Sequence, residues 1–202
     1  MPGIRTLLIL ALVVAGTLAW VAFLPATSSA LELRAGTLLD APRSIEGFEL
    51  IDQRRQPFGR GDLTGEWSLV FIGFTHCPDV CPSTLYLLDQ LDRRLLDKGH
   101  DIGTVFVSVD PERDTPEVLA EYLGHFSDRI AGVTGSHSQL SGFCEQLDFA
   151  YVKIPGSEGR YTVDHSGALA LIDPQARLLG YFLPPFEVDA LTADIALAIS
   201  RR

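Results

Sequence analysis

The stretch WSLVFIGFTHCPDVCPST, residues 67–84, joins an apolar run to two closely spaced cysteines. The run Trp67–Phe74 does not alternate polar with apolar residues, which is typical of a strand buried on both faces of a sheet. Pro82 would cost a backbone hydrogen bond inside a helix, so we expect a helix to begin with Pro82 in its first turn. Cys77 and Cys81 are therefore predicted in a tight loop between a buried strand and a helix N-terminus.

This pair is compatible with three roles: a redox dithiol, two metal ligands or a structural staple. The positive end of the helix dipole favours thiolate over thiol, so both sulfurs are expected to be good nucleophiles and good ligands. A disulfide across so short a loop removes little chain entropy, which disfavours the staple. Cys144 lies in an apolar helical pattern, so we expect oxidation to join Cys77 to Cys81 and to leave Cys144 free.

The rest of the chain alternates between strand and helix patterns. Helices are expected over 83–96, 115–126, 138–147 and 186–199, and strands or extended segments over 48–51, 104–109, 130–133, 151–154, 167–172 and 178–182. This order predicts an α/β domain over residues 45–202, with a mixed sheet and flanking helices. With a cysteine pair at the end of the first buried strand, the arrangement is thioredoxin-like.

The N-terminal segment carries no charge from Thr6 to Leu31. The apolar run Leu7–Leu24 is long enough to cross a bilayer, so residues 1–24 are predicted to be a transmembrane anchor and residues 25–44 a linker. The alternative is a cleaved signal peptide, because Ser28, Ser29 and Ala30 are the small residues that signal peptidase prefers. Both interpretations place the domain outside the cytoplasm, where disulfides persist.

The chain has 202 residues and a formal net charge of −10. Nucleic-acid binding needs a basic surface to meet the phosphates, so no nucleic-acid partner is expected.

A metal at the cysteine pair needs further ligands. Zinc prefers four, and the other cysteines for it are lacking, whereas Cu(I) accepts two or three and prefers thiolates. We expect the third ligand to be a histidine. His165 is the strongest candidate, because it precedes a predicted hairpin strand whose entry packs beside the first helix in a thioredoxin-like topology, and Asp164 is expected to orient its imidazole. The other histidines are expected at the surface or directed away: His76, His100, His125 and His137.

Four motifs resemble those of the Sco/SenC family of mitochondrial and bacterial copper proteins. They are FIGFTHCPDVCPST at 71–84, SVDPERDTPEVLAEYL at 108–123, GVTG at 132–135 and YTVDHSGALALIDP at 161–174. The resemblance implies a thioredoxin-like fold that binds Cu(I) or Cu(II) through Cys77, Cys81 and His165. It implies a role in building the dinuclear copper site of cytochrome c oxidase, either as copper donor or as reductant of that site's cysteines. The family pattern gives Cys144 no role.

The apolar N-terminal run and the resemblance together imply the location, and the resemblance implies the partners. The protein is expected in the inner membrane of a bacterium, with a single span and its folded domain on the periplasmic side. The expected partners are the copper-bearing subunit of the oxidase and another periplasmic copper chaperone.

The alternative function is that of a thiol–disulfide oxidoreductase, in which Cys77 and Cys81 reduce the cysteines of a partner protein. The usual C-x-x-C signature of such enzymes is one residue shorter. A thiol peroxidase is disfavoured, because the cysteines are paired and flanked by prolines. His165 separates the remaining two functions, since dithiol exchange does not need it and metal binding does.

Overall fold

The computed structural model describes residues 3 and 33–200. The predicted anchor over Leu7–Leu24 lies outside these residues. Among the residues described, no helix is both long and apolar enough to span a membrane.

The core of the fold is an eight-stranded mixed sheet with the strand order β1-β10-β9-β4-β5-β6-β2-β3. Its central strands β4, β5 and β6 are parallel, and β9 pairs antiparallel with β4. The strands are β1 Gly36–Ser44, β2 Glu49–Asp52, β3 Pro57–Gly59, β4 Trp67–Gly73, β5 Ile102–Ser108, β6 Ile130–Thr134, β9 Leu169–Asp173 and β10 Arg177–Phe182. The predicted α/β fold with a mixed sheet is confirmed.

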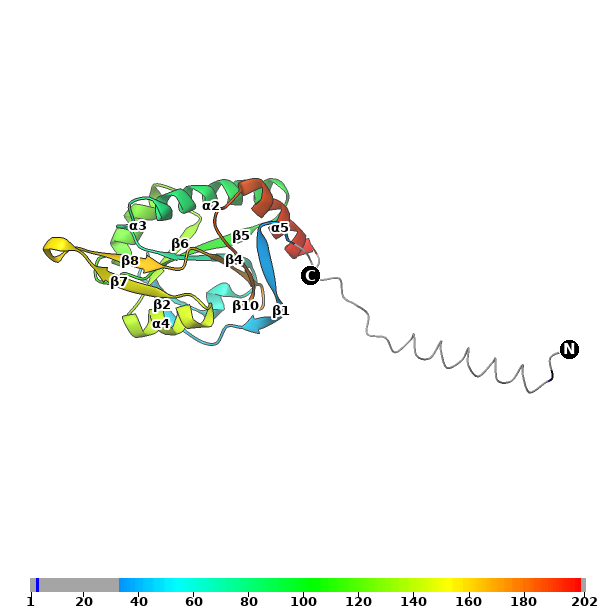
Figure 1. Ribbon diagram of the computed structural model, residues 1–202, viewed down its shortest axis with the longest axis horizontal. Coiled ribbons are helices and arrows are strands. Elements are labelled where there is room, and N and C mark those ends of the chain that lie inside the picture. The colour runs from blue at the N-terminus through cyan, green and yellow to red at the C-terminus, as the bar shows by residue number, and fades with distance from the viewer. Residues whose placement is uncertain (1–2, 4–32, 201–202) are drawn as a thin grey trace. The chain divides into compact units, whose positions relative to one another are not determined.

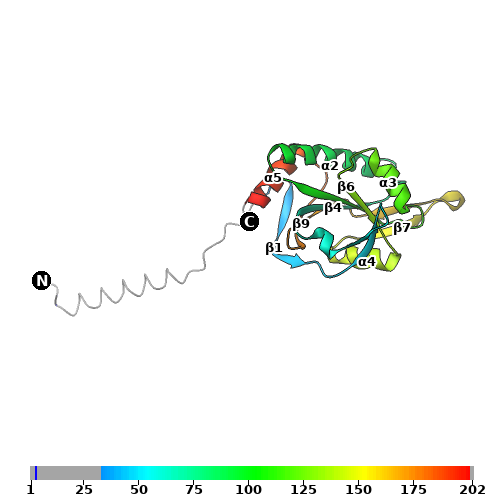
Figure 2. The same cartoon turned by 180° about the vertical axis from the view of Figure 1, so that it is seen from behind.

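Helices cover both faces of this sheet. Figure 1 shows α2, α3 and α5 above the sheet and α4 below it, and the view from behind in Figure 2 agrees. The bounds are α2 Val80–Asp97, α3 Pro116–Gly124, α4 His137–Gln146 and α5 Val188–Ser200, with 3-10 turns η1 Arg60–Leu63 and η2 Ser157–Gly159. Pro82 lies in the first turn of α2, as predicted.

Strand β1 lies within the segment predicted as a linker. It pairs antiparallel with β10 and forms one edge of the sheet, so the folded domain begins before residue 45. None of its nine residues is fully buried, and it has a register shift between Leu38 and Arg43. An edge strand with so few buried side chains has no clear hydrophobic periodicity, which is why the sequence pattern resembles a linker.

A second, two-stranded sheet stands apart from the first. Strands β7 Tyr151–Pro155 and β8 Tyr161–His165 form a hairpin with η2 at its tip. Figure 1 shows this hairpin projecting from the body of the domain. We predicted the extended segment at 151–154 but not its partner strand β8. His165 is the last residue of β8, whereas we expected it in a loop before a strand.

Candidate metal centre

The cysteine loop begins where β4 ends, at the carboxyl edge of the parallel strands. Cys77 donates its backbone N–H to the Phe74 carbonyl over 3.2 Å, and Cys81 points its N–H at Cys77 Sγ over 3.4 Å. Cys81 lies in the first turn of α2 and is fully buried, whereas Cys77 is half-buried. One sulfur is thus enclosed by the protein and the other faces the surface.

The β7–β8 hairpin brings His165 to this loop. Its Nε2 lies 3.5 Å from Cys81 Sγ, although 84 residues separate the two in the chain. Its Nδ1 lies 3.0 Å from the Ser166 carbonyl oxygen. Because a carbonyl only accepts hydrogen bonds, Nδ1 carries the proton and Nε2 presents its lone pair to the sulfur.

Two aromatic rings enclose the imidazole. The rings of Phe71 and Phe74 meet the His165 ring edge to face, with centroid distances of 6.1 and 6.0 Å. Both phenylalanines are almost fully buried, so they exclude water from these sides of His165 and fix its orientation.

The two sulfurs and an imidazole nitrogen of His165 all lie within 4.8 Å of one another. Within residues 33–200, this is the one group of three or more Cys, His, Asp or Glu side chains near enough to share a metal ion. Two sulfurs and an imidazole are soft to borderline donors, so the set suits a soft metal ion.

The comparison with known families agrees with this geometry. The family model described as SCO1/SenC matches residues 37–200. This chain belongs to the SCO1/SenC family.

Relatives in the family cover most of this chain. A SCO2-like protein of Rickettsia felis is 39% identical over 137 residues, which is 67% of each chain. The crystal structure of Arabidopsis thaliana ScoI with copper bound has a TM-score of 0.74 at 32% identity, covering 78% of this chain and 98% of that one. Yeast Sco1 with copper bound has a TM-score of 0.75 at 29% identity, covering 80% and 91%. These matches confirm the thioredoxin-like fold.

Asp164 does not orient the imidazole in this SCO1/SenC domain, contrary to our expectation. The acceptor for His165 Nδ1 is the Ser166 carbonyl. Asp164 is exposed and pairs across the hairpin with Val152, while His165 pairs with Tyr151. Successive residues of a strand point to opposite faces, so Asp164 points away from the face that holds His165.

The expected activation of both thiols is not found for Cys81. Burial raises the pKa of this thiol well above its ordinary value, and a backbone hydrogen bond from Phe74 only partly opposes the effect. A buried thiol of this kind becomes a thiolate when a cation is bound beside it.

The remaining histidines of the SCO1/SenC domain lie apart from the sulfurs. The side chain of His76 is 53% exposed and contacts the Thr75 hydroxyl at 3.0 Å. His137 Nε2 lies 3.6 Å from a carboxylate oxygen of Glu112. His125 is exposed and His100 is half-buried. None of the four joins the group of Cys77, Cys81 and His165.

Cys144 is buried in α4, as predicted from its apolar helical pattern. Figure 1 shows α4 on the opposite side of the sheet from α2, which carries Cys81. All three cysteines of this SCO1/SenC domain are free thiols in the structure.

A buried carboxylate behind the cysteine loop escaped the sequence analysis. Asp114 is fully buried and accepts hydrogen bonds from the Thr75 backbone N–H at 2.8 Å, the Thr75 hydroxyl at 2.6 Å and the Ser108 hydroxyl at 2.5 Å. It ties the start of the cysteine loop to the end of β5. The available signal was the run of polar residues directly after the buried strand at 104–109, since such strand ends meet at one edge of a sheet.

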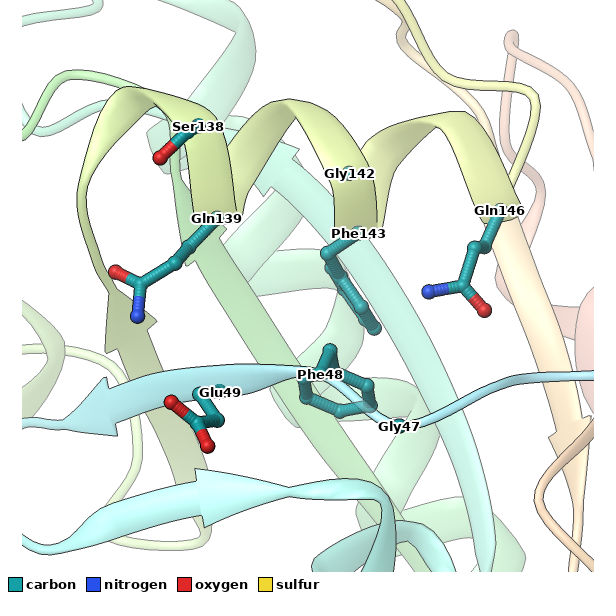
Figure 3. Close-up of a pocket in the computed structure, with 8 residues that line it drawn as sticks. All are labelled: Gly47, Phe48, Glu49, Ser138, Gln139, Gly142, Phe143 and Gln146. Atoms are coloured by element: carbon teal, nitrogen blue, oxygen red, sulfur yellow. The ribbon is translucent and has the colours of Figure 1, made fainter.

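A separate groove lies between α4 and the start of β2. Figure 3 shows Phe143 of α4 above Phe48, with Gln139 and Gln146 on either side. Its volume is about 450 Å³. Cys77, Cys81 and His165 are not among its lining residues, so this groove is separate from the candidate metal centre of the SCO1/SenC domain.

Proposed function

We propose that this protein is a membrane-tethered copper chaperone that binds Cu(I) and Cu(II) through Cys77, Cys81 and His165. The observation that carries the proposal is the convergence of two sulfurs and one imidazole nitrogen within 4.8 Å. Thiolates are the ligands that Cu(I) prefers, and the imidazole also suits Cu(II). The copper-bound relatives from Arabidopsis thaliana and yeast support the choice of metal.

The unequal burial of the two cysteines supports both the binding and the release of copper. Two thiolates and Cu(I) carry a net charge of −1, which the neutral imidazole does not change. Cys77 is half-buried, and Val80, three residues further along the loop, is exposed, so a partner's ligands can approach the metal through this loop. The site thus holds copper with one side open for exchange.

We infer that the copper is delivered to the dinuclear copper site of cytochrome c oxidase, from the periplasmic face of the inner membrane. Membership of the SCO1/SenC family and the resemblance of the four motifs to Sco/SenC proteins support this assignment. The proposed partners are the copper-bearing oxidase subunit and a second periplasmic copper chaperone, with the predicted helix at Leu7–Leu24 as the tether.

The second candidate is a thiol–disulfide oxidoreductase that uses the same cysteines. The observation in its favour is the asymmetry of the pair, because an accessible Cys77 beside a buried Cys81 resembles an attacking and a resolving thiol. Alkylation of the unfolded, air-oxidised protein should then modify Cys144 alone, since Cys77 and Cys81 are expected to be joined.

The ligand set is tested by loading copper into the reduced full-length protein. Replacement of Cys77 or Cys81 by Ser should abolish tight binding, because one thiolate and one imidazole make a poor Cu(I) site. His165→Ala should leave weak Cu(I) binding on two sulfurs and strongly shift or remove the Cu(II)–thiolate charge-transfer absorption. His125→Ala is the control and should change neither. If His165→Ala keeps the wild-type Cu(II) stoichiometry and spectrum, the metal site is wrongly assigned and the dithiol function is preferred.

A further inference from the structure

Tyr161, the first residue of β8, contacts two cationic side chains. The Arg113 Cζ is 3.8 Å from the centroid of its ring, and the Lys153 Nζ is 3.7 Å from the same centroid. Both cations therefore lie within cation–π contact distance of this ring. Each contact is attractive, because the faces of an aromatic ring are electron-rich.

The polar groups of Tyr161 are also held. Its hydroxyl donates to Asp110 Oδ1 at 2.7 Å and lies 3.3 Å from Glu112 Oε2. Its carbonyl accepts a hydrogen bond from Arg113 Nη1 at 3.2 Å. Arg113 is paired with Asp110, and Lys153 with Glu112, so the two cations are balanced by two carboxylates.

Arg113 also lies near Phe74, the residue directly before the cysteine loop of the candidate metal centre. Its guanidinium carbon is 5.6 Å from the centroid of the Phe74 ring, which packs edge to face against His165. Arg113 Nη2 is buried without a hydrogen-bond partner in the part of the chain that the structure describes. Arg113 therefore contacts both the strand that carries His165 and the residue from which the cysteine loop departs.

The hairpin needs such a connection. Strands β7 and β8 pair only with each other, and an isolated two-stranded hairpin is marginally stable in water. Tyr161 and His165 are four residues apart in β8, so their side chains lie on the same face of the hairpin. Contacts that hold Tyr161 against the domain therefore add to those of the buried Val163 in setting the position of His165.

We propose that Arg113 and Tyr161 are positioning residues that clamp β8 to the domain and thereby set His165 against Cys77 and Cys81. Neither residue is a ligand. The inference rests on the proposed function, because the consequence of the clamp is the coordination of copper.

The test compares Arg113→Gln, Arg113→Lys, Tyr161→Leu and Tyr161→Phe in the full-length protein. Arg113→Gln and Tyr161→Leu should raise amide hydrogen exchange in residues 161–165 of the metal-free protein about tenfold and weaken Cu(II) binding by roughly 10–100-fold, with a shifted charge-transfer band. Cu(I) on the two sulfurs should be largely kept. Arg113→Lys and Tyr161→Phe retain the cation and the ring respectively, so they should recover part of the wild-type behaviour.

Arg129→Gln is the matched control. Arg129 also pairs with two carboxylates, those of Asp92 and Asp101, but it contacts neither β8 nor the cysteine loop. It should leave the Cu(II) spectrum and the exchange of residues 161–165 unchanged. Unchanged exchange and spectra in Arg113→Gln and Tyr161→Leu would overturn the clamp. If the wild-type protein itself binds no copper, the proposed function fails. Amide hydrogen exchange in the metal-free variants still tests the clamp in that case.

Discussion

Cys144 illustrates at the scale of one residue how burial changes an ionisable group. Its side chain is 1% exposed, and burial raises the pKa of the thiol to about 12, with a smaller effect from Glu145. The pKa of an exposed cysteine is about 8.5–9, so between pH 9 and 12 the unfolded chain loses this proton while the folded chain keeps it. The folded state therefore loses stability relative to the unfolded state as the pH rises through this window.

The first prediction follows from this difference. The free energy of unfolding of the wild type should fall with pH more steeply than that of Cys144→Ala between pH 9 and 11, by up to about 1.4 kcal/mol per pH unit. Urea unfolding at pH 8, 9.5 and 10.5 measures both slopes. Below pH 8 the two proteins should differ by a constant amount. Parallel profiles up to pH 11 would contradict the shifted pKa.

The proposed ligand residues differ in how far the sequence predicts them. The positions of Cys77 and Cys81 are predicted by the neighbouring sequence alone, because the buried run before them and Pro82 after them predict a loop at a helix N-terminus. His165 depends on a contact across 84 residues, so its selection needed the order of all the elements. Asp164 was wrongly assigned to the imidazole because the segment was not recognised as a strand. The period of two in a strand places Asp164 on the face opposite to His165.

At the scale of the elements, the end of β4 controls the site through Gly73. A Cβ added there would lie 2.8 Å from Cys81 Sγ and 2.8 Å from Phe106 Cε2, both closer than such atoms approach. Phe106 is fully buried and has little room to move. Only glycine lets α2 bring Cys81 so close to the strand.

The second prediction is that Gly73→Ala displaces Cys81 without removing a ligand. Overpacking of this kind should cost about 1–3 kcal/mol of folding free energy, measured by urea unfolding. It should also weaken copper binding and change the charge-transfer spectrum. Gly103→Ala in β5 is the control, because a Cβ there finds its nearest atom, Ser68 Oγ, at an ordinary 3.5 Å. Equal spectra for the two variants would refute the steric role of Gly73.

The elements that the sequence predicted well are those with most of their residues buried. In β4 and β5 six residues each are buried, and long apolar runs mark both in the sequence. Strands β1 and β8 were missed because neither buries more than one residue. Such strands are fixed by pairing and by contacts with distant side chains, which hydrophobic periodicity does not record.

At the scale of the whole molecule, the predicted anchor determines whether the domain stays attached to the membrane. The third prediction is that full-length protein isolated from bacterial cells begins at or near Met1 and requires detergent, because Leu7–Leu24 is uncharged and long enough to cross a bilayer. Mass spectrometry of the intact chain identifies the first residue. A detergent-free mature form that begins near Leu31 would show that the segment is a cleaved signal peptide.

The proximity of Cys81 to His165 has a consequence for the lifetime of the protein in the cell. A copper ion held by both residues, as we propose, would cross-link positions 84 residues apart, and the unfolded chain could not form the same site. A ligand that binds only the folded state adds roughly 4 kcal/mol of stability when its free concentration is a thousand times its dissociation constant. Under the proposed function, delivery of the metal would remove this increment and increase the fraction of unfolded chains that proteases can attack. Molecules that have given up their copper should therefore be degraded sooner than loaded ones.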